Sequence, residues 1–166
     1  MKVLSRTLLF LSLVFTVGCS STDELDRAGE LYRSGNVSAS EQAFRELAGK
    51  KLVSPGTRAK ALFNLGVVLQ GQKKYDDAIA AFTRIFDAGA DDREPGEHLM
   101  ECCRNYGHRA CLRISACHDE AGRVREALHW AEKARTEFPC QDWCGTCAEQ
   151  DAKRVTAVIR RLKSKL

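Results

Sequence analysis

The chain has 166 residues and a formal net charge of +4. This length suits one domain with its own hydrophobic core. The charge excess is too small to argue for a nucleic-acid partner, and we expect none.

The first residues predict an export signal. Lys2 and Arg6 make the start positive, residues 8–17 form a predominantly apolar run, and no acidic residue occurs before Asp23. This run of ten residues is too short to span a bilayer as a helix, but it matches the core of a signal peptide. We therefore expect residues 1–18 to be removed, and the loss of two cationic residues lowers the formal net charge from +4 to +2.

The junction that follows the apolar run reads Thr16-Val17-Gly18-Cys19. It resembles the lipobox of bacterial lipoproteins, apart from Thr16, where that family usually has Leu. The resemblance implies cleavage before Cys19, a diacylglycerol on its thiol and a fatty acid such as palmitate on its amine. Several acyl chains give stable membrane anchoring. Ser20, in place of Asp, implies sorting to the periplasmic face of the outer membrane. An ordinary secretory signal, cut at a nearby small residue, is the alternative.

The rest of the chain predicts helices. No stretch alternates apolar and polar residues long enough to indicate a strand, whereas apolar residues recur at intervals of three and four. Gly71 and Gly122 separate paired apolar stripes and predict tight helix–helix turns. Pro55, Pro95 and Pro139 fall where helices are expected to stop.

Residues 59–92 resemble a tetratricopeptide repeat (TPR), a helix–turn–helix unit of 34 residues. The residues that carry the resemblance are Leu62, Leu65, Gly66, Leu69, Tyr75, Ala78 and Phe82. A second copy covers 108–141, with a clear second helix and a first helix in which Ser115 replaces the signature Gly. A weaker third copy covers 21–54. The resemblance implies an all-α solenoid of helical hairpins within residues 19–141.

Two further segments complete the expected architecture. The copies at 59–92 and 108–141 are 15 residues further apart than the repeat requires, so residues 93–107 are an insertion, expected to form a short helix. Residues 142–166 predict a final helix with Ala152, Val155, Ile159 and Leu162 on its apolar face. We expect this helix to cap the open end of the solenoid. Its many basic residues leave contact with anionic lipid or an acidic partner as the alternative.

Seven cysteines remain besides the lipidation site, all in the C-terminal half: Cys102, Cys103, Cys111, Cys117, Cys140, Cys144 and Cys147. Export to an oxidising compartment favours disulfides, which would staple this half of the solenoid. The odd number leaves one thiol over, and the pairing is open. The cysteine-rich Sel1-like branch of the TPR superfamily, which this half loosely resembles, also bridges its helices.

The sequence disfavours or excludes three other roles of the cysteines: thiol redox chemistry, zinc binding and haem attachment. The string from Trp143 to Cys147 resembles the active site of thioredoxin, but the strands of that fold are missing. Cys140, Cys144 and Cys147 with His98 or His118 could supply four zinc ligands, but the usual paired Cys-x-x-Cys is absent. Haem attachment is excluded because Ala148, not His, follows Cys147. We expect no metal site, no cofactor beyond the acyl groups and no catalytic residue.

The resemblance to TPR proteins implies that the first helix of each hairpin lines a groove for another polypeptide. The residues it places there are Lys60, Phe63, Val67, Gln70, Arg109, Leu112, Ala116 and Asp119, extended by Leu25 and Tyr32 from the weakest copy. The sequence therefore favours a lipid-anchored envelope scaffold or assembly factor that binds a protein segment and no small-molecule substrate. The alternatives are a periplasmic thiol–disulfide oxidoreductase using Cys144 and Cys147, and a purely structural lipoprotein.

Overall fold

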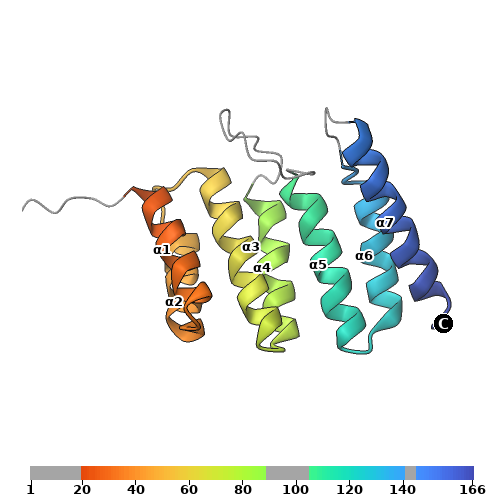
Figure 1. The fold of residues 1–166 in the computed structure, drawn as a ribbon, viewed down its shortest axis with the longest axis horizontal. Helices are drawn as coiled ribbons and strands as arrows, with labels where there is room; N and C mark the ends of the chain where they lie inside the picture. The colour runs from red at the N-terminus through yellow and green to blue at the C-terminus, as the bar shows by residue number, and fades with distance from the viewer. Residues whose placement is uncertain (1–19, 89–104, 141–144) are drawn as a thin grey trace, which may run out of the picture.

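The computed structural model describes residues 20–88, 105–140 and 145–166, which form helices and no strand. The helices are α1 (Ser21–Arg33), α2 (Val37–Gly49), α3 (Pro55–Gly71), α4 (Tyr75–Asp87), α5 (Tyr106–Glu120), α6 (Val124–Thr136) and α7 (Gly145–Lys163). Figure 1 shows them standing side by side in chain order, with α1 and α7 at opposite ends of the row. The predicted all-α class and the TPR-like arrangement are confirmed.

The helices form three hairpins, α1–α2, α3–α4 and α5–α6, and α7 packs on the last one. Each second helix lies against the first helix of its own hairpin and that of the next. In the described part of the chain, α1 also contacts α3 and α3 contacts α5, whereas α2, α4 and α6 make no comparable contact with one another. Because the first helices approach more closely than the second helices, the row curves toward α1, α3 and α5. We call this side the first-helix face.

Polar caps and one proline set where the helices begin. Ser20, Asn36, Ser54 and Asn105 accept backbone N–H groups at the starts of α1, α2, α3 and α5. Pro55 is the first residue of α3, where its missing N–H costs nothing and its fixed φ suits a helix. The expectation that Pro55 ends a helix was therefore wrong. The prediction for Pro139 holds, since α6 ends at Thr136, and Pro95 lies outside the described residues.

The three hairpin turns share one backbone conformation. Gly35, Lys73 and Gly122 have φ angles of 82°, 61° and 77°, in the left-handed region. All three fall at the same position of the three sequence copies, two residues before the second helix. Gly71, which was predicted to make the α3–α4 turn, is instead the last residue of α3, and the turn rests on Lys73. A non-glycine residue there carries steric strain from its Cβ.

We expect Lys73→Gly to stabilise the protein modestly. Glycine removes the Cβ conflict at a φ of 61°, which is worth about 1 kcal/mol before the extra freedom of the unfolded chain is subtracted. Chemical denaturation should show a rise in unfolding free energy of about 0.5 kcal/mol. The matched change at a turn that already has glycine, Gly122→Ala, should lower stability. A loss of stability in Lys73→Gly would show that the turn is unstrained.

The two helices of each hairpin touch through small residues. Ala28 faces Ser40 and Ser115 faces Ala127, Gly66 and Ala78 occupy the same two positions of the middle hairpin, and all six residues are buried. The serine belongs to the second helix, α2, in the first hairpin and to the first helix, α5, in the third hairpin. Ser40 Oγ donates to the Ala28 carbonyl at 2.9 Å, and Ser115 Oγ donates to the Ala127 carbonyl at 2.7 Å. A hydroxyl that bonds across the hairpin explains why Ser115 can replace the signature glycine.

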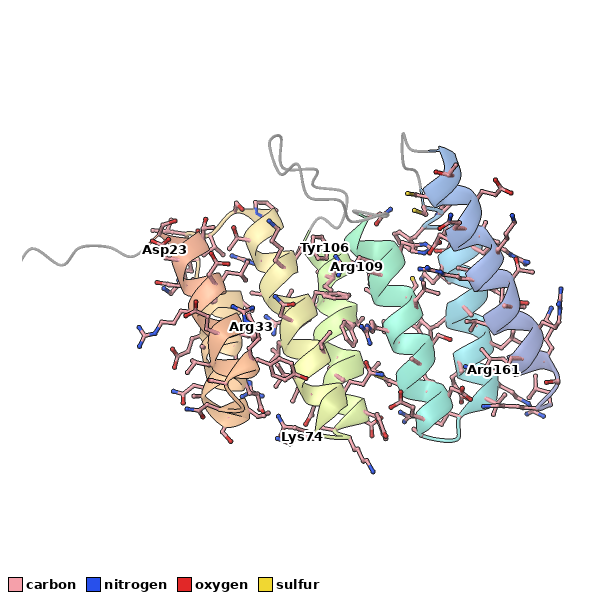
Figure 2. All side chains as sticks on the ribbon, viewed as in Figure 1. Asp23, Arg33, Lys74, Tyr106, Arg109 and Arg161 are labelled. Carbon is pink, nitrogen blue, oxygen red and sulfur yellow. The ribbon has the colours of Figure 1, made fainter. Side chains whose placement is uncertain are left out.

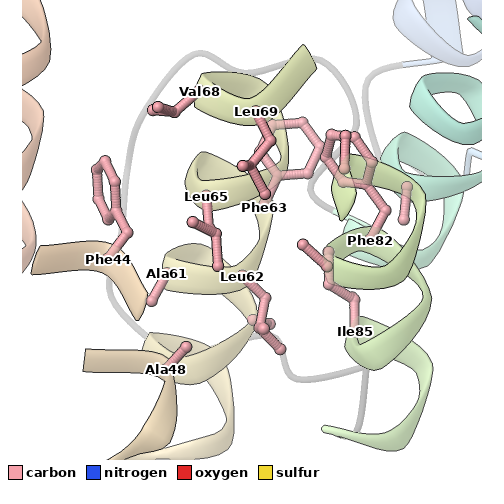
Figure 3. Close-up of a cluster of buried hydrophobic side chains, with 14 of the residues drawn as sticks. Phe44, Ala48, Ala61, Leu62, Phe63, Leu65, Val68, Leu69, Phe82 and Ile85 are labelled. Atoms are coloured by element: carbon pink, nitrogen blue, oxygen red, sulfur yellow. The ribbon is translucent and has the colours of Figure 1, made fainter. Parts of the chain in front are cut away.

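The core runs along the α2–α3–α4 junctions and is drawn in Figure 3. Its fully buried large side chains include Phe44, Leu47, Leu62, Leu69, Phe82 and Ile85. Phe82 lies directly over Gly66, where an added Cβ would come within 2.5 Å of the ring. The glycine therefore lets the aromatic ring enter the space between α3 and α4.

The last helix, α7, closes the C-terminal end of the stack. Val155, Ile159 and Leu162 are buried against a cluster that includes Ala127 and Ala131 of α6. Ala152, which was expected on this apolar face, is exposed. Most of the basic residues that follow are engaged within the molecule: Lys153 with Glu149, Arg161 and Lys165 with Asp119, and Lys163 with Glu132. This pairing supports the capping role over the alternative of a free basic surface.

The expected disulfide staple is not found among the described cysteines. Cys111 and Cys117 are buried thiols on α5, in no disulfide, at the positions that Leu62 and Val68 occupy in the preceding hairpin. Burial raises the pKa of Cys111 to about 12 and that of Cys117 to about 11. A buried thiol of this kind packs as a small apolar residue. Cys19, Cys102, Cys103 and Cys144 lie outside the described residues, and no disulfide joins Cys140 to Cys147.

Candidate functional site: the first-helix face

The exposed side of α3 forms the middle of the first-helix face. Lys60, Asn64, Val67 and Gln70 are half-buried along it, and Gly71 is exposed. Their spacing of three and four residues places them on one stripe of the helix. The structure thus places three of the predicted groove residues on this face: Lys60, Val67 and Gln70.

Phe63 lies deeper than expected. Only 5% of its surface is exposed, and its ring packs against Phe82 at 5.6 Å and Tyr106 at 5.7 Å between centroids. It joins α3 to α4 and α5 as part of the core, so it does not form the open apolar floor that the sequence suggested. A substitution at Phe63 would therefore destabilise the fold and would be a poor test of binding.

Arg109 is held on this face by aromatic rings. Its guanidinium carbon lies 4.3 Å from the centre of the Phe63 ring and 5.3 Å from that of Tyr106. Figure 2 shows Tyr106 and Arg109 together between α3 and α5. The cation–π contacts fix the position of the guanidinium over the two rings. The sequence placed Arg109 here but missed Tyr106, three residues earlier on the same face of α5.

A polar seam continues along the α3–α5 junction. Gln70 Nε2 donates to Glu120 Oε1 at 3.0 Å, and Arg113 Nη1 donates to Gln70 Oε1 at 3.4 Å. Arg113 is exposed and was also missed. The position of Arg113 on the first-helix face could have been predicted, because Arg109, Arg113 and Glu120 follow one another at helical spacing on α5.

Two of the predicted groove residues on α5 face the other way. Leu112 packs against the apolar cluster of α6 and α7, and Asp119 pairs with Arg161 at 2.8 Å and with Lys165 at 2.5 Å. Both residues secure α7 to the stack. Ala116 is half-buried. The α5 side of the face is thus rotated from the predicted stripe by about one residue.

The first hairpin extends the face at the N-terminal end. Tyr32 of α1 is 40% exposed, and a Cβ placed on Gly71 would lie 3.5 Å from its hydroxyl. Leu25 is half-buried against the core. Tyr32 therefore offers an aromatic surface beside α3, whereas Leu25 mainly supports the packing.

The histidines and cysteines of the described part are not grouped as metal ligands. Among residues 20–88, 105–140 and 145–166, no group of three or more His, Cys, Asp or Glu side chains is placed to hold a metal ion. Burial lowers the pKa of His118, which favours its neutral form. Cys144 of the thioredoxin-like string and His98 of the zinc hypothesis lie outside the described residues.

The comparisons with known proteins concern the fold. No protein-family model matches the chain, and no curated protein matches its sequence. Among solved structures, the chain is similar to the crystal structure of PcrH from Pseudomonas aeruginosa, with a TM-score of 0.63 and 18% sequence identity. The match covers 91% of this chain and 99% of PcrH. At this identity, the likeness supports the shared helical-repeat architecture only.

Proposed function

We propose that this chain is a lipid-anchored module of the bacterial envelope that binds a segment of another protein on its first-helix face. The observation that carries the proposal is the α3–α5 seam: Lys60 and half-buried Val67 lie on the exposed stripe of α3, and Arg109 and Arg113 line the α5 side, Arg109 over the Phe63 and Tyr106 rings. TPR-like stacks present such faces to extended or helical segments. The PcrH-like fold is consistent with a helical scaffold of this kind.

The charges of the seam favour an acidic partner segment or a terminal carboxylate. Three cationic side chains line it, and the carboxylate of Asp119 on α5 points away from it to Arg161 and Lys165. Glu120 accepts a hydrogen bond from Gln70. Arg guanidinium groups recognise carboxylates through paired hydrogen bonds. An acidic segment would therefore find complementary charge along the α3–α5 junction.

The anchor is the second part of the proposal. The lipobox-like junction supports acylation of Cys19 and a position on the periplasmic side of the outer membrane. In the described part of the chain, no helix is long and apolar enough to cross a bilayer. Mass spectrometry of the mature N-terminal peptide tests the anchor. The anchor would be supported if the native peptide carries the mass of acyl groups on Cys19. The Cys19→Ala variant should lose this mass and should no longer be found in the membrane fraction.

We expect Arg113→Glu to weaken partner capture by about fivefold, the equivalent of about 1 kcal/mol for a charge at the edge of an interface. A photo-crosslinking residue at Val67, in living cells, would report capture as the yield of a covalent adduct. Arg113 is exposed and its one hydrogen bond, at 3.4 Å, is weak, so the fold should tolerate the change.

Arg84→Glu is the matched control, because Arg84 is an exposed residue of α4, on the opposite side of the hairpin. It makes the same change of charge and should leave the adduct unchanged. Equal losses in both variants would point to a general charge effect. Adducts that form from Thr83 on α4 but not from Val67 would move the binding site off the first-helix face.

A further inference from the structure

The connection between α2 and α3 projects an apolar side chain into solvent. Leu52 is 99% exposed, more than any other large hydrophobic residue of the described part. Lys50 and Lys51 precede it, and both are exposed. A single exposed leucine is common on protein surfaces, so its meaning depends on how it is held and what lies beside it.

The loop is braced at both ends, so that the exposure of Leu52 is built into the fold. Lys50 Nζ contacts the Glu24 carboxylate oxygens at 2.5 and 2.6 Å. Arg58 Nη2 donates to the Lys50 carbonyl at 2.7 Å. At the other end Ser54 caps α3, and Val53 packs against the core. Only Lys51 and Leu52 are left to project from the surface.

The same bracing places this tip beside the start of the folded domain. Glu24 belongs to the first turn of α1. Figure 1 shows the start of α1 and the α2–α3 connection at one edge of the stack, whereas the hairpin turns and the C-terminus lie at the opposite edge. The Lys51–Leu52 tip thus lies at the edge from which the chain leaves toward its N-terminus.

The tether to the anchor is very short. Ser20 is already fixed as the cap of α1, since its N–H donates to Asp23 Oδ2 and its Oγ accepts from the N–H of Thr22, both at 3.2 Å. Cys19 directly precedes Ser20 in the chain, and consecutive Cα atoms are about 3.8 Å apart. An acylated Cys19 would therefore hold the α1 edge of the domain against the bilayer.

We propose that the Lys51–Leu52 tip is a second membrane contact, in which Leu52 enters the interface and Lys51 meets anionic headgroups. This inference rests on the proposed acylation of Cys19. Leucine gains free energy on leaving water, and a lysine at an anionic surface is attracted to it. With two contacts at one edge, the stack stands on the membrane with the first-helix face accessible from the side.

The test uses acylated full-length protein in vesicles of phosphatidylethanolamine and phosphatidylglycerol whose acyl chains carry bromine, a fluorescence quencher. Leu52→Trp adds an emitter at the tip, and Leu166→Trp adds one at the opposite edge. Leu166 is the matched control, because it is also an exposed leucine that follows lysines, 64% exposed. The native tryptophans give the baseline.

We expect bromolipid to remove most of the added emission of Leu52→Trp and to leave that of Leu166→Trp. Adding Lys51→Glu to Leu52→Trp should reduce the quenching, and unchanged quenching would overturn the role of Lys51. Equal quenching at both sites, or none at Leu52→Trp in protein with acyl mass on Cys19, would overturn the membrane contact and leave the anchor standing. If no acyl group is found on Cys19, the anchor itself fails and this inference fails with it.

Discussion

Gly66→Ala should destabilise the protein by about 2 kcal/mol, within the range typical of an overpacked core. The new Cβ would lie 2.5, 2.6 and 2.7 Å from three atoms of the Phe82 ring. That ring is fully buried and packs against Phe63, so it has little room to move. The expected readout is a lower midpoint in urea denaturation with an unchanged slope.

Gly49→Ala is the matched control for this prediction. Gly49 is also helical, at the end of α2, but a Cβ there would have no neighbour within 4 Å. Because alanine favours helix over glycine, Gly49→Ala should be neutral or slightly stabilising. The same propensity gain at Gly66 is outweighed by the clash.

A double-mutant cycle separates the clash from other causes. Phe82→Leu removes ring atoms that Gly66→Ala would meet, at the expense of a small cavity. The two changes together should cost less than the sum of their separate costs. Additive costs would show that Gly66 is needed for some reason other than the approach of Phe82.

The repeat pattern was predictable because it depends on local and periodic properties. Small residues such as Gly66 and Ala78 at a fixed offset, and a large one such as Phe82, identify where two helices must approach closely. The turn residue was harder to find, because glycine was the expected signal. Lys73 takes the left-handed conformation without being glycine, and so the prediction settled on Gly71 nearby.

The candidate site was predicted less well because it depends on the rotation of each helix. On α3 the predicted stripe was close, with Phe63 buried and Lys60, Val67 and Gln70 along the face. On α5 nothing in the local pattern indicated that Asp119 would pair with the C-terminal segment around α7. The partners of Asp119 are Arg161 and Lys165, more than 40 residues away, and such distant pairing has no local signature.

The cysteines show a similar limit. Their number and the export signal favoured disulfides, but composition does not reveal which thiols face the core. Cys111 and Cys117 replace aliphatic residues of the preceding hairpin, and burial raises the pKa of both. Only the packing of α5 against its neighbours distinguishes these two thiols from residues in a bridge.

A buried histidine joins the last three helices. His108 is 2% exposed at the start of α5. Its Nδ1 lies 2.6 Å from the Phe138 carbonyl oxygen and 3.2 Å from that of Ala134, and its Nε2 lies 2.8 Å from Asp151 Oδ2 on α7. The ring thus lies between two backbone carbonyl oxygens on its Nδ1 side and a carboxylate oxygen on its Nε2 side. His108 thus connects the cap to the solenoid from inside.

His108→Ala should lower the unfolding free energy by about 3 kcal/mol, because it leaves a cavity and a mostly buried Asp151 carboxylate without its partner. Hydrogen exchange should show the amides of α7 losing protection more than those of α3. Adding Asp151→Ala should recover part of the loss, since the unpaired charge is then removed.

The stability loss of Asp119→Ala is the comparison for that of His108→Ala. Asp119 also ties α7 to α5, but its partners Arg161 and Lys165 have exposed side chains, and pairs of that kind contribute about 0–1 kcal/mol each. If burial decides the strength of the attachment, His108→Ala must cost clearly more than Asp119→Ala. Equal costs, or α7 protection that falls only in Asp119→Ala, would mean that the outer ion pairs hold the cap and that the buried histidine merely fills space.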